Sequence, residues 1–348
     1  KILITIGVVA GYFAGILHLF GFYILQIATI LFVAILLIFI FFYLHKAQFK
    51  FPVKKSLFEY IGEFYIFCRP LVLATAFAQV IIIIKNWALM YWSGIASSAL
   101  FGVAWQLNVI ISYIFSPYAE LMKREFAVIH NNEDILRYRV QQSLKVMAWL
   151  ISFFCVFIAV YASDVLTVLF GDKYSDAVLI TQLIMLYTVY QAWGQILGSF
   201  MLAVEQTRAY SIISMIGNIF SLVLLYFFQC PNFIRPNGFG ANGMGWSYVI
   251  GNIFSVTLML CFITRKMNMR FLELYAIPII SMIGCFIISF VPYVFLGKCI
   301  FDSGMIFMVL RILCGGLLYC GIVMLLIWKF PRILGIDKAV LRQKLSFW

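Results

Sequence analysis

The chain has 348 residues, of which 65% are hydrophobic and 11% are charged, and it carries a formal net charge of +12 at pH 7. Its mean hydropathy of +1.04 lies far above the range of soluble domains. This composition excludes a soluble globular protein and indicates an integral membrane protein.

Apolar runs long enough to cross a hydrocarbon core, roughly 20 residues each, follow one another along the whole chain. The run from Ile2 to Leu44 is too long for one helix and predicts two spans that meet around His18. Eight further spans give about ten in total. They cover residues 69–92, 95–117, 141–162, 177–203, 209–228, 242–263, 274–296 and 305–328. Runs of this length predict helices rather than barrel strands, so the expected fold class is all-α and polytopic.

Two segments outside the predicted spans are basic. Residues 46–68 begin with several lysines and continue, from Leu57 to Tyr65, with apolar residues at helical spacing. This pattern predicts an amphipathic helix that lies on the cytoplasmic surface of the membrane. Residues 329–348 form a basic tail.

Lysine and arginine gather in alternate connections, which is the signal that orients membrane proteins. One set of connections contains only Lys173, Arg235 and Lys298. The other set contains Lys46, Lys50, Lys54, Lys55, Arg69, Lys123, Arg124, Arg137, Arg139, Arg208, Arg265, Lys266, Arg270, Lys329, Arg332, Lys338, Arg342 and Lys344. Both chain ends are therefore expected in the cytoplasm. Most of the positive net charge is explained by this orientation signal, to which attraction between basic loops and anionic lipid would add. No nucleic acid partner is expected, because no soluble domain is present to recognise one.

The segment LFGDKYSDA, residues 169–177, joins two predicted spans on the outer side. It consists of Leu-Phe-Gly, two residues, Tyr, two residues and Ala between two apolar helices. Other positions carry the same family pattern in order and spacing. They are Arg69-Pro70-Leu71, Ser93-Gly94 with Gly102 and Ala104, Pro117 before a charged loop, and Gly240-Ala241-Asn242-Gly243. Over about residues 60–265 the chain resembles the polysaccharide or O-antigen flippases of the multidrug/oligosaccharidyl-lipid/polysaccharide exporter superfamily.

The resemblance implies that the chain forms part of a two-lobed transporter. Residues 1–45 resemble the last two helices of a first lobe, and 46–68 the linker between lobes. Residues 69–263 resemble the six-helix second lobe, and 264–328 an additional helix pair. Four helices of the family pattern have no counterpart, so we expect an N-terminally incomplete chain or an aberrant member. Such a chain alone would not form the two-lobed cavity that alternating access requires.

The resemblance also implies a function. These flippases move an undecaprenyl-diphosphate-linked oligosaccharide from the inner to the outer leaflet of the bacterial inner membrane, while the lipid tail stays in the bilayer. Membrane lipids and polysaccharide polymerase or assembly proteins are the further partners that the resemblance implies. A cationic, hydrogen-bonding interior is expected, and charged residues inside spans are the place to look for it.

Lys85 lies inside a predicted span, about 10 Å below the expected outer interface. Its side chain could snorkel to that interface or face a cavity. Gln79 and Asn86 are seven residues apart on one helical face, with Lys85 beside them, which favours a substrate-binding stripe. In the resembling family an acid often stands near this position. This chain has Lys85 there instead, so the resemblance does not imply that an acid at this site couples transport to a cation.

Five further residues are substrate-binding candidates, each with a structural alternative. Gln106 and Asn108 lie close together on the next span, where such residues also form interhelical hydrogen bonds. Gln141 and Lys145 are one turn apart at a cytoplasmic entrance and could meet a diphosphate, although lysine is also a common interfacial anchor. Arg311, inside the last span, could serve substrate, an acidic lipid or a partner helix.

Three competing functions stay open at this point. A small-molecule cation antiporter of the same superfamily would need acids inside spans, where Asp and Glu are almost missing. A membrane-embedded glycosyl- or acyltransferase would need a catalytic acid or histidine near an interface, and only Asp164, Asp172 and Glu205 are candidates. A non-catalytic assembly subunit is the third alternative.

The sequence contains no recognisable constellation for catalysis or cofactor binding. Its 3 histidines are scattered, and neither a P-loop nor a dinucleotide-binding glycine pattern occurs. We therefore expect no enzyme activity, no cofactor and no metal site. The glycine spacings of Gly7, Gly11 and Gly15, and of Gly194 and Gly198, predict close helix packing instead.

Overall fold

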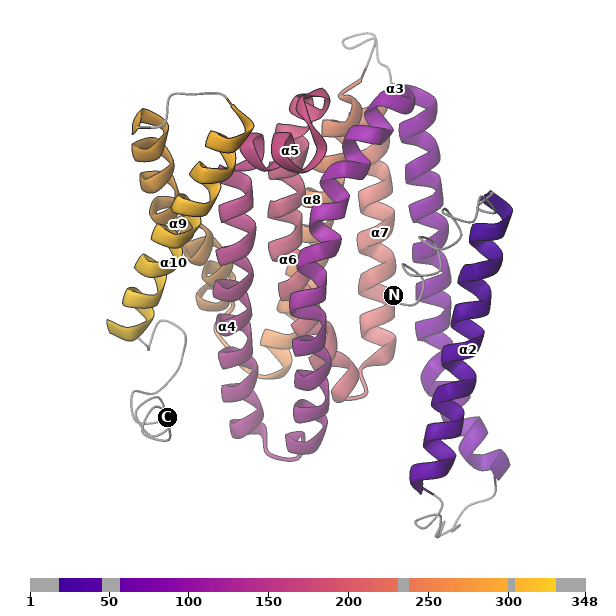
Figure 1. Cartoon of the computed structure of the whole chain (residues 1–348). Helices are drawn as coiled ribbons and strands as arrows, with labels where there is room; N and C mark the ends of the chain where they lie inside the picture. The colour runs from indigo at the N-terminus through magenta and orange to yellow at the C-terminus, as the bar shows by residue number, and fades with distance from the viewer. Residues whose placement is uncertain (1–18, 46–56, 231–237, 300–303, 330–348) are drawn as a thin grey trace. The chain divides into compact units, whose positions relative to one another are not determined.

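The structure is a computed structural model that describes residues 19–45, 57–230, 238–299 and 304–329 (Figure 1). Every regular element in these ranges is a helix, as predicted. The predicted span before His18, the glycines Gly7, Gly11 and Gly15, residues 46–56 of the linker and residues 330–348 of the tail lie outside the described part.

The chain divides into two compact units, Lys1–Gly62 and Glu63–Trp348. The first unit contains α2 (Leu19–His45), an apolar helix, together with the first residues of α3 (Leu57–Ile129). The second unit contains the rest of α3 and all later helices. The predicted additional helix pair therefore belongs to the same compact unit as the six helices before it.

Helix α3 is a hairpin of two helical arms rather than one rod. Gly94 interrupts it with φ 79° and ψ 176°, and Figure 1 shows α3 folding back on itself. The side chains on the two arms meet the same partner, since Lys85 and Phe101 both contact the ring of Tyr248. The predicted spans 69–92 and 95–117 correspond to these arms.

The first arm of α3 begins at Leu57 and continues through Pro70 without a break. The sequence instead predicted a separate amphipathic helix on the membrane surface, ending before Arg69. The apolar residues before Pro70 run directly into those after it, and proline within a helix that crosses a membrane is tolerated when neighbouring groups satisfy the freed carbonyl. The described part of the linker is therefore continuous with the helix of the first span and is not a separate helix.

Six further long helices follow, of 23 to 29 residues each. They are α4 (Glu133–Val160), α6 (Val178–Ala203), α7 (Thr207–Gln229), α8 (Gly240–Lys266), α9 (Phe271–Cys299) and α10 (Met305–Lys329). At about 1.5 Å per residue, each is long enough to cross a hydrocarbon core of about 30 Å. Their positions agree with the predicted spans.

In the described residues, seven helices are long and apolar enough to cross a membrane, with α3 counted once. Many large apolar side chains on these helices are exposed, which suits contact with lipid. The chain is therefore a multi-pass, all-α membrane protein. The predicted total of about ten spans also depends on residues before His18, which lie outside the described part.

The segment LFGDKYSDA turns the chain between two short helices. It contains the end of α5 (Ala162–Phe170), and Gly171, with φ 86° and ψ 167°, separates α5 from a 3₁₀ helix (Asp172–Ala177) that leads into α6. The chain thus turns at Gly171, and α6 begins at Val178 without a side-chain cap. Helix α5 lies at the same end of the second unit as the turn at Gly94 (Figure 1).

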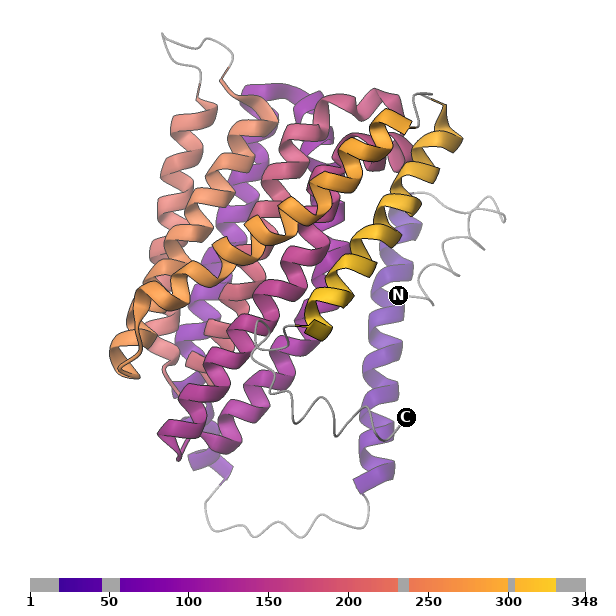
Figure 2. The ribbon, with the colours of Figure 1, turned by 90° about the vertical axis from the view of Figure 1, so that its left-hand side faces the viewer.

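Helices α4, α6, α7 and α8 pack side by side, and α9 runs obliquely across the bundle (Figure 2). Interhelical hydrogen bonds join the helices at several levels. Ser152 bonds to Ser281 at 2.9 Å between α4 and α9, and the Tyr319 hydroxyl of α10 donates to the Phe153 carbonyl of α4 at 3.0 Å. These bonds hold the last two helices against the bundle.

We expect Gly94→Ala to destabilise the protein by about 1–3 kcal/mol, because a β-carbon strongly disfavours this region of φ and ψ. Loss of stability would be measured as a lower unfolding temperature of the purified protein in neutral detergent.

Gly102→Ala is the matched control. An added Cβ meets no heavy atom within 4 Å at either glycine, but Gly102 has no positive φ. Alanine there should leave stability unchanged or raise it by up to about 1 kcal/mol. Equal effects of the two substitutions would show that the Gly94 backbone is not strained by a side chain.

Candidate functional site

Lys85 is buried inside the bundle, with 3% of its surface exposed. Its Nζ donates a hydrogen bond to Ser221 Oγ at 2.6 Å and lies 3.9 Å from the centroid of the Tyr248 ring. Ser221 Oγ in turn donates to the Ser247 carbonyl at 3.0 Å. An isolated ammonium in an apolar bundle is costly, and this hydroxyl and ring face partly replace its water. The side chain therefore does not snorkel to the interface.

A cavity of about 280 Å³ adjoins Lys85, and we call it the Lys85 pocket. It lies between the first arm of α3 and helices α6, α7 and α8. Its lining consists of Lys85, Tyr187, Gln191, Gly194, Gln195, Tyr210, Ser214, Gly217, Asn218, Ser221, Tyr248, Gly251, Asn252, Ser255, Val256 and Met259. Amides and hydroxyls dominate this lining. Among its described residues none is an aspartate or a glutamate, and Lys85 is its only charged side chain.

Small residues bring the helices around the pocket close together. A Cβ added to Gly217 would lie 2.6 Å from Ser255 Cβ, and one added to Gly251 would lie 2.5 Å from Ser221 Cβ. The predicted packing role of the Gly194 spacing agrees with the structure, since a Cβ there would lie 2.8 Å from a methyl of Val256. Close approach of α7 and α8 places their serines against Lys85 instead of larger side chains.

Aromatic rings form one wall of the pocket. Tyr187 and Tyr248 line it, with ring centroids 5.5 Å apart at an interplanar angle of 83°. Trp105 stands behind them, 5.6 Å from Tyr187 and 5.2 Å from Tyr248. Edge-to-face and tilted contacts of this kind stabilise the packing of the rings against one another.

The hydrogen-bonding capacity of the lining is only partly used. Asn252 Nδ2 donates to the Tyr187 carbonyl at 3.3 Å. Gln191 Oε1 is buried and has no hydrogen-bond partner among the described residues. Buried polar groups are rarely left unsatisfied, so a bound polar molecule or water is expected at Gln191.

Of the stripe predicted around Lys85, only Lys85 itself faces the pocket. Gln79 and Asn86 are exposed, on a different face of α3 from Lys85. Helical periodicity explains the separation, because Ala74, Ile81 and Ala88 share the buried face with Lys85. The structure thus separates Lys85 from Gln79 and Asn86, with which the sequence grouped it.

The second pair of candidates is also divided. Gln106 is exposed on the second arm of α3. Asn108 is buried, and its Oδ1 accepts a hydrogen bond from Thr188 Oγ1 of α6 at 2.9 Å. Asn108 therefore has the interhelical role that the sequence gave as an alternative.

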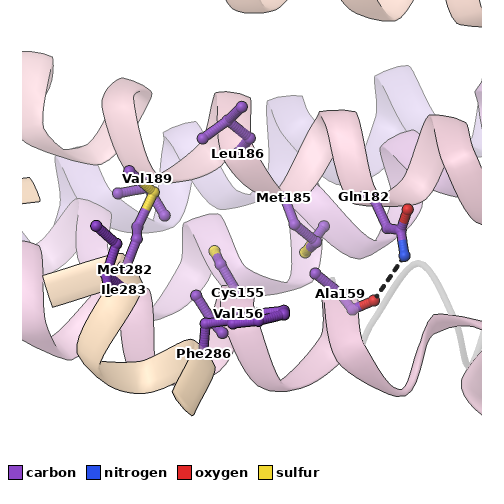
Figure 3. Close-up of a pocket in the computed structure, with 10 residues that line it drawn as sticks. All are labelled: Cys155, Val156, Ala159, Gln182, Met185, Leu186, Val189, Met282, Ile283 and Phe286. Atoms are coloured by element: carbon purple, nitrogen blue, oxygen red, sulfur yellow. Dashed lines mark hydrogen bonds between the residues drawn. The ribbon is translucent and has the colours of Figure 1, made fainter. Parts of the chain in front are cut away.

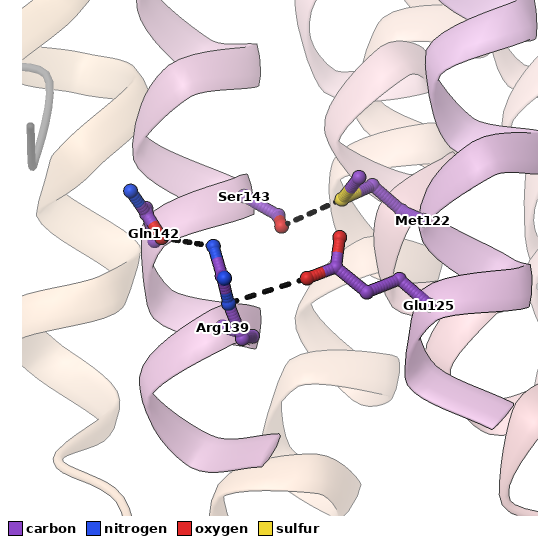
Figure 4. A network of polar contacts seen from close by, with 5 residues as sticks. All are labelled: Met122, Glu125, Arg139, Gln142 and Ser143. Atoms are coloured by element: carbon purple, nitrogen blue, oxygen red, sulfur yellow. Dashed lines mark hydrogen bonds and ion pairs between the residues drawn. The ribbon is translucent and has the colours of Figure 1, made fainter. Parts of the chain in front are cut away.

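Gln141 and Lys145 lie half-buried on α4, away from the Lys85 pocket. The polar network beside them joins α4 to the second arm of α3 (Figure 4). In it Arg139 Nε lies 3.2 Å from Glu125 Oε1, and Arg139 Nη1 donates to Gln142 Oε1 at 3.2 Å. This network fastens the ends of two helices, and neither Gln141 nor Lys145 lines a described cavity.

Arg311 of α10 lies next to the carboxylate of Asp164 on α5, with Nη1 at 3.4 Å from Oδ2. Both side chains are largely buried, at 16% and 7% exposure. The partner-helix alternative for Arg311 is thus the one observed. The sequence did not reveal this pair, because 147 residues separate its members.

An apolar cavity of about 340 Å³ lies between α4, α6 and α9 (Figure 3). Its lining includes Cys155, Met185, Met282 and Phe286. Gln182 also lines it, but its Nε2 already donates to the Ala159 carbonyl at 3.2 Å. This cavity offers no charged side chain, so it could accept an apolar group but could not recognise a polar one.

Three polar stripes on α6, α7 and α8 supply most of the pocket lining and were not identified from the sequence. Gln191 and Gln195 are one turn apart on α6. Asn218 and Ser221 lie on α7, and Asn252 lies on α8 with Ser255 one turn away. Spacings of three or four residues place each set on one helical face, which was a usable signal.

We expect Arg311→Met to destabilise the protein by about 3–5 kcal/mol, because it leaves the Asp164 carboxylate buried without its cation. The double variant with Asp164→Asn should recover part of that loss, which a double-mutant cycle of unfolding measurements would detect. Arg270→Met is the control, since Arg270 pairs with Glu273 on the exposed surface, where little change is expected.

The same variant should respond to pH. Burial raises the pKa of the Asp164 carboxyl, and the neighbouring Arg311 opposes that rise. A carboxyl whose pKa is raised in the folded state stabilises the fold at pH values below the ordinary pKa of aspartate. That stabilisation is lost as the pH rises through the raised pKa. The deficit of Arg311→Met should therefore shrink as the pH falls towards about 4. A deficit that does not change with pH would contradict a buried, unpaired carboxylate.

Comparison of the chain with models of protein families, with curated proteins and with solved structures found no match. The geometry of the Lys85 pocket is therefore the observation from which a function can be argued.

Proposed function

We propose that this chain forms part of a transporter that moves a lipid-linked oligosaccharide from the inner to the outer leaflet of a bacterial plasma membrane by alternating access. One observation carries the proposal: Lys85 is buried within an apolar helix bundle, at the edge of a pocket rich in amides and hydroxyls. Charges inside membrane bundles are costly and mark substrate pathways.

The lining of the Lys85 pocket suits a glycan joined to an anionic diphosphate. Amide groups such as those of Gln191 and Asn218 both donate and accept hydrogen bonds, which matches the hydroxyls of a sugar. Lys85 supplies a positive charge for phosphate oxygens. The ring of Tyr187, which also lines the pocket, offers apolar surface for a sugar ring.

The size of the pocket also bears on the substrate. A volume of about 280 Å³ is near the lower end of ligand pockets, which run from roughly 300 to 1,000 Å³. The pocket would thus hold part of a repeat unit, with the rest of the glycan outside it. The isoprenoid tail would stay among the exposed apolar side chains of the bundle, in the bilayer.

The alternatives have less support from the geometry. A cation antiporter would need a carboxylate in its pocket, and none lines this one. A transferase would need an acid or histidine in a substrate pocket, yet Asp164 is paired with Arg311, and neither Asp172 nor Glu205 lines any of the three described cavities. Among the described residues no group of His, Cys, Asp and Glu could hold a metal ion.

We expect Lys85→Met to lower the rate of glycan transfer to the outer leaflet by about tenfold or more, because a charge-assisted hydrogen bond contributes about 1.5–3 kcal/mol. The gene would be deleted in its host and replaced by the intact reading frame carrying each variant. Complete lipid-linked repeat units should accumulate on the inner leaflet with Lys85→Met and not with the wild type.

Asn86→Ala is the matched control, since Asn86 is the next residue along α3 but is exposed outside the pocket. It should transport as the wild type does. If both variants lost transport to the same extent, the Lys85 pocket would not be the substrate site. Accumulation of unfinished glycan, instead of complete units, would contradict the transport function and favour a membrane-embedded transferase.

A further inference from the structure

A third cavity, of about 340 Å³, lies between the first arm of α3 and the start of α7. Its lining consists of Tyr65, Ile66, Arg69, Pro70 and Leu73 on α3 and Arg208 on α7. All six residues belong to the same compact unit.

The cavity lies at the membrane boundary opposite the Gly94 turn. Arg69 is separated from Gly94 by about 38 Å of helix at about 1.5 Å per residue, which exceeds the thickness of a hydrocarbon core of about 30 Å. Arg208 is the second residue of α7, so it lies a full helix length from the other end of that helix. We therefore expect both guanidinium groups at headgroup level.

The charge of this cavity is not neutralised within the described part of the chain. Arg69 and Arg208 are both exposed, and no acid lines the cavity with them. The nearest acid to Arg208 in the sequence is Glu205, and it forms no described ion pair with Arg208. Two cations beside the amino-terminal end of α7, where the helix dipole is positive, favour a bound anion.

The rest of the lining is apolar. Tyr65, Ile66 and Leu73 are 62%, 64% and 57% exposed. A free inorganic anion would gain nothing from these side chains. A molecule with a phosphate at one end and a hydrocarbon chain at the other would use both halves of the cavity.

We infer that this cavity binds an anionic membrane phospholipid, with its phosphate between Arg69 and Arg208 and an acyl chain along Leu73, towards the interior of the bilayer. The inference is independent of the transported substrate, since the cavity shares no residue with the Lys85 pocket. The site would fix the boundary of the bundle to one leaflet of the bilayer.

The test is native mass spectrometry of the purified full chain in neutral detergent, titrated with phosphatidylglycerol or with phosphatidylcholine. Phosphatidylglycerol should bind more tightly to the wild type. Arg69→Ala or Arg208→Ala should weaken its binding by roughly fivefold each, and the double variant by roughly 25-fold, as expected for loss of basic residues near a lipid surface.

Arg265→Ala is the matched control, because Arg265 is also exposed and ends α8 at the same end of the bundle, outside the cavity. It should bind phosphatidylglycerol as the wild type does. Unfolding temperatures in detergent without lipid should be equal for all variants, since both cavity arginines are exposed.

Three results would overturn the inference. The double variant could bind phosphatidylglycerol as tightly as the wild type, or Arg265→Ala could lose as much affinity as the cavity variants. In the third, inorganic phosphate would displace the lipid at equal concentration, which would make the cavity a site for free anions.

Discussion

The charge of Lys85 inside an apolar bundle is the constraint on which the rest of the site depends. An ammonium group at this depth needs partners, and the structure supplies the hydroxyl of Ser221 and the face of Tyr248. Both partners come from helices distant in sequence, so the position of Lys85 requires α3, α7 and α8 to meet at one point. The Lys85 pocket forms where these helices come together.

Glycine makes that meeting possible. Gly217 and Gly251 lie where any side chain would overlap a serine on the facing helix, so α7 and α8 approach more closely than larger residues would allow. The serines and amides of these helices gather around Lys85 as a result. A pocket of polar groups within a lipid-facing bundle is an arrangement that stability alone does not favour, which is why it supports a binding role.

The large-scale architecture could be predicted from the sequence because it depends on local length and apolarity. The seven described long helices lie where apolar runs occur, and the Gly94 and Gly171 turns lie where the chain needs a residue without a side chain. The extension of α3 back to Leu57 could not be predicted from its amphipathic pattern. That pattern describes a surface helix and the edge of a span equally well.

The site was predicted only in part. Lys85 was identified because a charge within a span is unusual by itself, whereas Gln79 and Asn86 were grouped with it by sequence proximity and lie on another face. Arg311 and Asp164 form a pair across distant segments, and no local pattern reveals such a contact. Facing helices, rather than spacing within one helix, decide which polar residues meet.

The most direct test of the central claim is the affinity of the purified chain, in lipid nanodiscs, for an undecaprenyl-diphosphate-linked oligosaccharide. The account predicts that wild-type protein binds it and that Lys85→Met binds at least about tenfold more weakly. It also predicts that the same glycan without its diphosphate binds both proteins equally and weakly. Equal affinity of the two proteins for the complete substrate would contradict the claim that the buried charge serves recognition.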